Sequence, residues 1–168
     1  LPDGDGDLYV DVIDRCPTSS DPAQADGDSD GVGDVCDSCT STPNPRVSAT
    51  FLAAAPWATL TGGQRDDDHD GYGNRCDGGF PGVVGNLYSS GQLAQLRASS
   101  GKLRASDTCG TTQTRPCAIF DLDESGAVIS TNDLAIFRSR NGKAFGPRCA
   151  ICPLPCENGA QGTCGTIP

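Results

Sequence analysis

The chain has 168 residues, of which 36% are hydrophobic and 5% aromatic, and it carries 22 Asp and Glu against 12 Lys and Arg, for a formal net charge of −10. So low an apolar content is thin for a large core, and no cluster of Lys and Arg offers a surface for nucleic-acid phosphates. No apolar run approaches the roughly 20 residues that a membrane span requires. Cross-links and bound cations are therefore the expected sources of stability. The first residue is Leu1 and no signal-peptide pattern follows, so we expect a processed form or a segment of a longer polypeptide.

Ten cysteines in a chain rich in Gly and Pro predict a disulfide framework formed in an oxidising compartment. We therefore expect a secreted, extracellular or cell-surface protein. Zinc is the alternative use of cysteine, but it favours paired CxxC units, and only Cys149 and Cys152 have that spacing.

The N-terminal half repeats one spacing of oxygen-bearing side chains, at relative positions 1, 3, 5, 9 and 12. Calcium takes six to eight oxygen ligands at about 2.3–2.6 Å in a flexible shell, and this spacing suits it. A solvated acidic linker, the usual meaning of a charge run, has no reason to repeat such a spacing three times. The three sets are Asp3, Asp5, Asp7, Asp11 and Asp14; Asp26, Asp28, Asp30, Asp34 and Asp37; and Asp66, Asp68, Asp70, Asn74 and Asp77.

Positions 6 and 7 of each set complete the expected site. Calcium loops of this kind add a main-chain carbonyl at position 7, which here belongs to Tyr9, Val32 and Tyr72. Glycine at position 6 makes the sharp turn in the second and third sets, but Leu8 takes its place in the first. We therefore expect the first site to be distorted, weaker or completed by residues elsewhere in the chain.

The residues offer little support for an enzyme. The many carboxylates are already assigned to metal shells by their spacing, and no serine-nucleophile or phosphate-loop motif is present. The single histidine, His69, falls at position 4 of the third set, where side chains point outward. We expect it to be exposed and to have no catalytic role.

The segment 14–37, DRCPTSSDPAQADGDSDGVGDVCD, resembles a complete thrombospondin type 3 repeat. The resemblance covers residues 3–77 and is interrupted by an insertion at 40–63. It implies an extended, calcium-wrapped chain with little regular secondary structure and four or more bound ions across the protein. It also implies that neighbouring cysteines pair, Cys16 with Cys36 and Cys39 with Cys76.

The insertion contains the apolar tract FLAAAPWATL, with Phe51, Leu52, Trp57 and Leu60. These side chains either fold back into a local core or onto the second half, which we favour, or form a docking surface through which copies of the chain polymerise.

Residues 78–147 predict a small α-helical pair. Leu93, Leu96, Leu134 and Phe137 recur at equivalent places in two related segments and are the expected shared core, with Val83, Val84 and Val128 near the turns. Serine capping residues precede each segment and glycine follows it.

The second of these segments opens with FDLDESGAVISTNDLAIF, which resembles the loop-and-helix unit of dockerins and half EF-hands. The resemblance places Asp121, Asp123 and Ser125 at positions 1, 3 and 5, with the Ala127 carbonyl next and either Asn132 or Asp133 closing the shell. It implies a fourth calcium site and raises a cohesin-like partner. The first copy has lost its acidic residues and is expected to pack without an ion.

Six cysteines follow Cys76, and they permit fifteen pairings. Pairing between sequence neighbours gives Cys109–Cys117, Cys149–Cys152 and Cys156–Cys164, with the last two in a Cys-rich tail at 148–168. The clusters TSTPNP and TTQTRP are either surface turns or carriers of O-linked glycans.

Together these patterns predict an irregular, disulfide-rich, calcium-binding extracellular protein that is not an enzyme. Its role would be structural, as a rigid spacer or a self-assembling subunit of a surface fibre. The alternative is an adhesion or docking module that binds a protein or glycan partner.

Overall fold

The computed structural model describes residues 1–80, 87–113 and 115–147, and most of this chain is irregular. Its helices are α1 (Ala49–Ala54), α2 (Ser90–Ser99), α3 (Thr131–Arg140) and the 3₁₀ helix η1 (Cys117–Phe120). The strands form two antiparallel pairs, β1 (Leu60–Thr61) with β2 (Gln64–Arg65) and β3 (Thr108–Cys109) with β4 (Arg115–Pro116). The expectation of little regular β structure and a small helical pair is confirmed.

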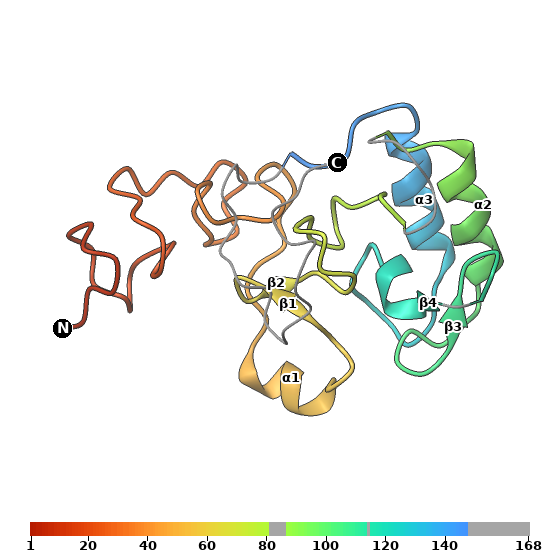
Figure 1. The fold of residues 1–168 in the computed structure, drawn as a ribbon, viewed down its shortest axis with the longest axis horizontal. Helices are drawn as coiled ribbons and strands as arrows, with labels where there is room; N and C mark the ends of the chain where they lie inside the picture. Colours follow the sequence, from red (N-terminus) through yellow and green to blue (C-terminus); the bar gives the residue numbers. More distant parts are fainter. Residues whose placement is uncertain (81–86, 114, 148–168) are drawn as a thin grey trace.

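The N-terminal half runs along the long axis of the molecule toward the helical half (Figure 1). The N-terminal loops lie at one end and the α2–α3 pair at the other, with α1 and the β1–β2 hairpin between them. None of the described helices is long and apolar enough to cross a membrane.

Both long helices begin and end as their sequences predict. Ser89 and Ser130 are the N-caps of α2 and α3, and each forms a capping box with the residue three positions later. Gly101 and Gly142 follow the two helices with φ of +80° and +78°, values that glycine adopts without a steric penalty.

The main apolar core surrounds this helix pair. Leu96 and Phe137 are buried within it, whereas Leu93 and Leu134 are only partly buried against it. The expected place of Val128 in this core is wrong, because its side chain is 37% exposed at an isolated β-bridge with Leu103. Val83 and Val84 lie outside the described residues. Much of the core consists of aromatic and aliphatic residues from turns and from η1, namely Phe80, Tyr88, Ile119, Phe120, Leu122, Ile129 and Phe145.

The aromatic residues of this core also attach the helix pair to the end of the preceding loop. The Tyr88 hydroxyl donates a hydrogen bond to the Cys76 carbonyl at 2.7 Å, and the Gly146 amide donates to the same oxygen at 3.0 Å. The Tyr72 ring meets the Phe145 ring edge-on at a centroid distance of 6.2 Å. The N-terminal half is thereby joined to the helical half through residues 72–76.

Three disulfides lie in the described chain, Cys16–Cys36, Cys39–Cys76 and Cys109–Cys117. They are three of the five pairs expected from the sequence. Cys149, Cys152, Cys156 and Cys164 lie outside the described residues.

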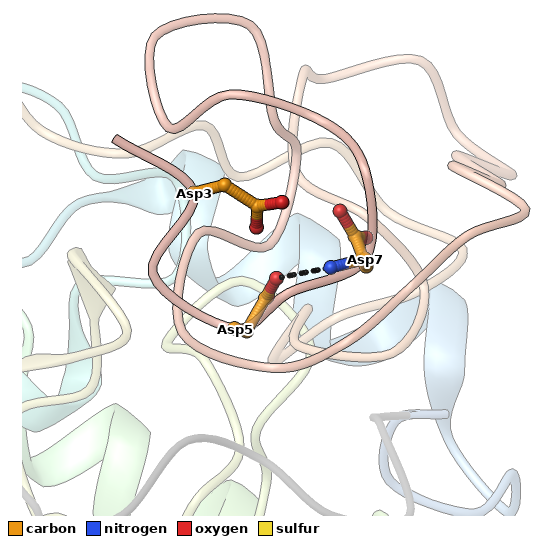
Figure 2. Close-up of side chains that lie close together, drawn as sticks. All are labelled: Asp3, Asp5 and Asp7. Atoms are coloured by element: carbon orange, nitrogen blue, oxygen red, sulfur yellow. Dashed lines mark hydrogen bonds between the residues drawn. The ribbon is translucent and has the colours of Figure 1, made fainter. Parts of the chain in front are cut away.

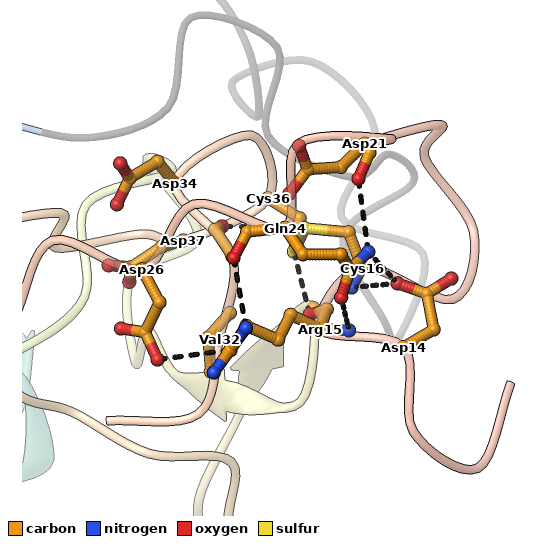
Figure 3. Close-up of a disulfide and its surroundings, with 12 residues drawn as sticks. Asp14, Arg15, Cys16, Asp21, Gln24, Asp26, Val32, Asp34, Cys36 and Asp37 are labelled. Carbon is orange, nitrogen blue, oxygen red and sulfur yellow. Dashed lines mark hydrogen bonds and ion pairs between the residues drawn. A yellow bond between two sulfur atoms is a disulfide. The ribbon is translucent and has the colours of Figure 1, made fainter. Parts of the chain in front are cut away.

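Two glutamine side chains repeat the same hydrogen bonds beside the first two disulfides. Gln24 accepts from the Arg15 amide at 2.9 Å and donates to Asp14 at 2.8 Å (Figure 3). Gln64 likewise accepts from the Ser38 amide at 2.9 Å and donates to Asp37 at 2.7 Å.

Asp21 and Asn44 are equivalent in the same way. The Asp21 amide donates to Asp7 at 2.9 Å, and the Asn44 amide donates to Asp30 at 2.7 Å. These matched bonds align Asp21-Pro22 with Asn44-Pro45 and Gln24 with Gln64. The additional chain is therefore residues 46–63, which leave the repeat after Pro45 and return to it at β2.

Gly33 and Gly73 let each loop pack closely against the disulfide before it. A Cβ atom on Gly33 would lie 2.7 Å from the Cys16 sulfur, and one on Gly73 would lie 2.9 Å from the Cys39 sulfur. The second glycine of the GVGD and GYGN segments is thus required by contact between successive repeats.

The apolar tract of the insertion folds back onto the molecule. Leu60 is only 6% exposed, so its expected place on a polymer interface is wrong. Trp57 is half-buried, with the guanidinium groups of Arg65 and Arg104 each 5.1 Å from its ring centroid. Phe51 meets the Trp57 ring edge-on at 6.4 Å. The tract therefore packs where the third loop meets the helical half. Phe51, Leu52 and Trp57 are left half-exposed.

Candidate metal sites

Four groups of three carboxylates have ligand oxygens within 4.8 Å of one another. Three groups come from positions 1, 3 and 5 of loop 1 (residues 3–14), loop 2 (26–37) and loop 3 (66–77). In Figure 2 the carboxylates of Asp3, Asp5 and Asp7 turn toward a common space inside the curled chain. The fourth group belongs to loop 4 (121–133) and consists of Asp121, Asp123 and Asp133.

All four loops curl through the same backbone conformation. Position 4 has a positive φ in each loop, and so does position 6. Leu8 adopts a φ of +84° at position 6 of loop 1, close to the +90° of Gly31 and the +89° of Gly71. The expected distortion of loop 1 is therefore absent from its backbone at this position, and the leucine takes the left-handed conformation that glycine takes elsewhere. The position 4 residues are Gly6, Ser29, His69 and Glu124.

Hydrogen bonds from the backbone hold the first and fifth positions of each loop. The position 1 carboxylate accepts from the position 6 amide at 3.2, 3.1 and 3.0 Å in loops 1, 2 and 3. The position 5 carboxylate accepts from the position 7 amide at 2.9, 2.8 and 2.8 Å. These bonds preorganise the carboxylates around one centre while leaving lone pairs on their oxygens.

Positions 9 and 12 have separate roles. The position 9 side chains, Asp11, Asp34 and Asn74, accept from the position 2 amide at 2.7, 2.8 and 2.9 Å, which closes the loop across its mouth. They do not belong to the close carboxylate groups. The position 12 carboxylates, Asp14, Asp37 and Asp77, accept from the amide two residues later.

Several of these carboxylates have buried oxygen atoms without a hydrogen-bond partner. Asp5 and Asp66 each have one buried oxygen that accepts no hydrogen bond, and both oxygens of Asp28 are in this state. An anionic oxygen in such a place costs free energy unless a cation neutralises it. The described residues therefore fit a hard, oxygen-binding cation at these centres.

The pKa values of the same groups report the crowding of negative charge. Burial, together with the carboxylates of Asp70 and Asp66, raises the pKa of Asp68 well above its ordinary value. Burial and the carboxylates of Asp70 and Asp68 act in the same way on the pKa of Asp77. The position 12 carboxylate thus shares the electrostatic environment of positions 3 and 5, as a common metal site requires.

The fit of these loops to a metal ion rests on their repeated geometry. No family model, curated protein or solved structure matches this chain. The matched spacings, backbone turns and buried oxygens are properties of the chain, and they point to cation binding without reference to a relative.

Replacing Leu8 with glycine is expected to increase the metal affinity of loop 1. A left-handed conformation costs an L-residue roughly 1–2 kcal/mol of folding free energy. Glycine avoids this cost, but its larger loss of chain entropy on folding offsets about 0.5–1 kcal/mol of the gain. The net gain of about 1 kcal/mol corresponds to roughly fivefold tighter metal binding at this loop in a calorimetric titration.

Leu8→Ala is the matched control, because it removes the exposed side chain but keeps the strained backbone, and it should leave the affinity nearly unchanged. An equal gain in both variants would show that φ at position 6 is not the cause.

The fourth group differs because arginine side chains already neutralise it. The Asp121 carboxylate, which is 0% exposed, forms ion pairs with Arg65 at 2.7 Å and with Arg104. The Ala127 carbonyl, an expected ligand, accepts a hydrogen bond from the Arg104 amide at 3.1 Å. Loop 4 therefore resembles loops 1–3 in its backbone conformation, but arginine side chains offset the negative charge of its carboxylates.

Of the two expected closing residues of loop 4, Asp133 belongs to the group of close carboxylates. Asp133 is 0% exposed, accepts from the Asp123 amide at 3.1 Å and also caps α3. Asn132 is exposed on the first turn of that helix. Ser125 remains at position 5, where its amide donates to Asp121 and Asp123 at 3.2 and 2.9 Å.

Replacing Arg104 with glutamine is expected to raise the calcium affinity of loop 4 by about fivefold or more, because a positive charge beside Asp121 is removed. The Gly126 amide resonance, followed during a calcium titration, reports this site. Arg138→Gln removes an exposed charge from α3 and is the control. Equal affinity in all three proteins would show that Arg104 does not compete with calcium for Asp121.

Some residues that organise the sites escaped the sequence patterns. His69 was expected to be exposed, but it is only 8% exposed, because its loop packs between the insertion and the helical half. Gln24 and Gln64 have no role in a metal-ligand pattern, although the Pro-to-Gln spacing in DPAQAD is a signal for the first of them. Arg65 is buried by contacts across the chain that no local pattern contains.

Proposed function

We propose that this chain is an extracellular structural module whose N-terminal loops bind calcium and are held as a rigid spacer by calcium and disulfides. The observation that carries the proposal is the threefold repetition of one loop, with the same backbone turn, the same hydrogen bonds and buried carboxylate oxygens that accept no hydrogen bond. The resemblance of residues 14–37 to a thrombospondin type 3 repeat supports it. We propose no enzymatic activity for this chain.

Calcium fits the donor set better than other common metals. The groups offer oxygen alone from an irregular, curled chain, which suits a large cation with a flexible shell. Zinc prefers sulfur and nitrogen, and the six described cysteines are all in disulfides. Magnesium requires near-ideal octahedral geometry and keeps much of its water.

The way in which the loops are connected supports a spacer role. The Cys16–Cys36 and Cys39–Cys76 bridges tie each loop to the linker before it, and Gly33 and Gly73 allow that close contact. Loops joined in series in this way extend along the long axis toward the N-terminus (Figure 1). The disulfides support secretion, since such bridges persist in oxidising compartments.

Calorimetric titration of the chelator-stripped, oxidised protein with calcium tests the proposal. At least three binding events are expected, and Asp28→Asn and Asp68→Asn should each remove one of them. Asp107→Asn changes a carboxylate outside the four groups and is the matched control. No calcium uptake by the unaltered protein would sink the proposal.

Self-association is a second candidate role, favoured by the exposed apolar side chains of the first loop. Leu8, Val12 and Ile13 are 91%, 74% and 67% exposed, which is unusual for three neighbouring apolar residues. We propose that a fibre, if this protein forms one, would use this loop together with the partly exposed Phe51, Leu52 and Trp57. Sedimentation of the calcium-loaded protein should then show concentration-dependent particles that Val12→Ser and Ile13→Ser abolish, and a strict monomer would exclude this role.

Docking through a cohesin-like partner, and O-linked glycans on the turns, remain weaker proposals that no contact of the described residues favours.

A further inference from the structure

A cavity of about 270 Å³ lies where the insertion, loop 3 and loop 4 meet. Its apolar wall contains Val47 and Phe51, and its polar wall contains Arg46, Arg65, Arg75 and Glu124. Arg75 and Glu124 belong to positions 10 and 4 of their loops, which are not ligand positions. Pockets for drug-sized molecules span roughly 300–1,000 Å³, so this one suits a ligand the size of a single sugar or amino acid.

Three of the polar side chains that line this cavity have incomplete hydrogen bonding. Arg65 Nε, Arg75 Nε and Glu124 Oε1 are buried atoms that make no hydrogen bond with the described residues. The Arg65 side chain is 1% exposed, and its two terminal nitrogens bind Asp67 and Asp121. Orphaned groups of this kind are rare in folded proteins, and three around one cavity indicate a polar partner.

The chemistry of these groups limits the partner. The residues that line the cavity carry two buried N–H donors and one buried carboxylate acceptor, and a hydroxyl is the group that both accepts and donates. Charge adds little selectivity for an anion. Arg65 is already paired with Asp67 and Asp121, and Arg75 Nε forms an ion pair with Glu124 at 3.5 Å. Arg46 donates its guanidinium hydrogens to the carbonyls of Gly62 and Arg15. A neutral molecule with adjacent hydroxyls satisfies all three groups without bringing a new charge into the site.

From this combination we propose that the cavity binds one neutral sugar unit of a glycan. Adjacent hydroxyls accept hydrogen bonds from the Arg65 and Arg75 side chains and donate to Glu124, with small movements of these side chains opening their buried atoms to the ligand. The C–H face of the sugar ring packs on Phe51 and Val47, which supply the apolar surface.

Calcium would support this site indirectly, and this part of the inference rests on the proposed function. Glu124 has a φ of +54° between Asp123 and Ser125, and Arg75 directly follows Asn74. Ordering loops 3 and 4 around calcium therefore fixes two side chains of the cavity. Sugar binding should be stronger in calcium than after chelation.

The test uses the oxidised, calcium-loaded protein and a panel of D-glucose, D-galactose, D-mannose and N-acetylglucosamine. Saturation-transfer NMR detects binding, and the fluorescence of Trp57, whose ring is 6.4 Å from that of Phe51, gives the affinity. At least one sugar is expected to bind with a dissociation constant on the order of 1–10 mM. Phe51→Ala and Glu124→Gln should each weaken that binding by about tenfold, measured by NMR.

Two matched controls separate the cavity from general effects on folding. Leu52→Ala shortens the neighbouring side chain of α1, and Arg138→Gln removes an exposed charge from α3; both should bind sugar as the unaltered protein does. Failure of every sugar up to about 100 mM, or tighter binding of acetate, sulfate or glycine, would overturn the proposal.

The same samples distinguish this inference from the proposed function. Calcium uptake in the calorimeter without any sugar response rejects the cavity proposal alone. Sugar binding that is equal with and without calcium, in a protein that takes up no calcium, rejects the proposed function and leaves the cavity proposal standing.

Discussion

Removing calcium from the oxidised protein is expected to leave it folded but to lower the stability of loops 1–3 against local unfolding far more than that of the α2–α3 pair. The only apolar cluster among the first two loops consists of Cys16, Val32 and Cys36, whereas the core of the helix pair contains eleven buried residues. Without cations, the crowded carboxylates of each loop repel one another, and little apolar burial opposes them. Amide hydrogen exchange, resolved by segment, should therefore accelerate by orders of magnitude in residues 3–77 and far less in α2 and α3.

The pH dependence of stability should reverse between the calcium-free and calcium-loaded protein. Burial raises the pKa of Asp37 to about 6 in the calcium-free fold, above its ordinary value of 3.8. A group whose pKa is raised by folding stabilises the folded state at pH values below its unfolded-state pKa. This stabilisation is lost as the pH rises through its folded-state pKa. The calcium-free protein should thus lose stability between about pH 4 and 7, with Asp37 alone accounting for up to about 3 kcal/mol.

The calcium-loaded protein should behave in the opposite sense, because the ions bind carboxylates only in their ionised form. Its stability should fall as pH drops from 7.5 to 5. Urea denaturation followed by Trp57 fluorescence, at both pH values with and without calcium, measures both slopes. If the calcium-free protein became more stable as pH rose, the buried carboxylates would not be the groups that destabilise it.

The local features of the sites could be predicted from the sequence because they depend on spacing. Carboxylates at positions 1, 3 and 5 curl around a centre, and the structure groups them as the spacing implies. The helix caps at Ser89 and Ser130 follow from local chemistry in the same way. Leu8 was the exception. The sequence shows that the expected glycine is absent, but it does not show that leucine would adopt the left-handed conformation in its place.

The features that join distant segments could not be predicted. Phe80, Phe120 and Phe145 fill the core from turns and a 3₁₀ helix, where no periodicity marks them as buried. Gln64 takes the place of Gln24 only because the insertion returns to the same point in space, which its sequence does not reveal. Arg65 is the strongest case, since a charged residue in an acidic segment is usually exposed.

Replacing Arg65 with methionine is expected to destabilise the calcium-free protein by about 3–5 kcal/mol. The Arg65 side chain is 1% exposed and bridges Asp67 of loop 3 to Asp121 of loop 4, whose side chains are 2% and 0% exposed. Burial acts to lower the pKa of Arg65, but the two carboxylates outweigh it and raise the pKa, so the guanidinium stays charged. Methionine keeps most of the volume and leaves two buried carboxylates without their shared cation.

Urea denaturation measures the loss, and Arg97→Met, an exposed arginine in α2, is the control that should cost under about 0.5 kcal/mol. Adding Asp121→Asn to the Arg65→Met protein removes one of the unpaired charges and should recover part of the stability, a coupling that a double-mutant cycle quantifies. Loss of the same size in Arg97→Met, or no recovery in the double variant, would contradict the ion-pair mechanism.

Calcium should reduce the cost of losing Arg65. An ion bound in loop 4 would neutralise Asp121 in place of the guanidinium, so the Arg65→Met protein should gain more stability from calcium than the unaltered protein does. The difference between the two gains measures how strongly the arginine and the ion compete for one carboxylate. A calcium effect of equal size in both proteins would mean that loop 4 holds no ion and that Arg65 acts there as its permanent cation.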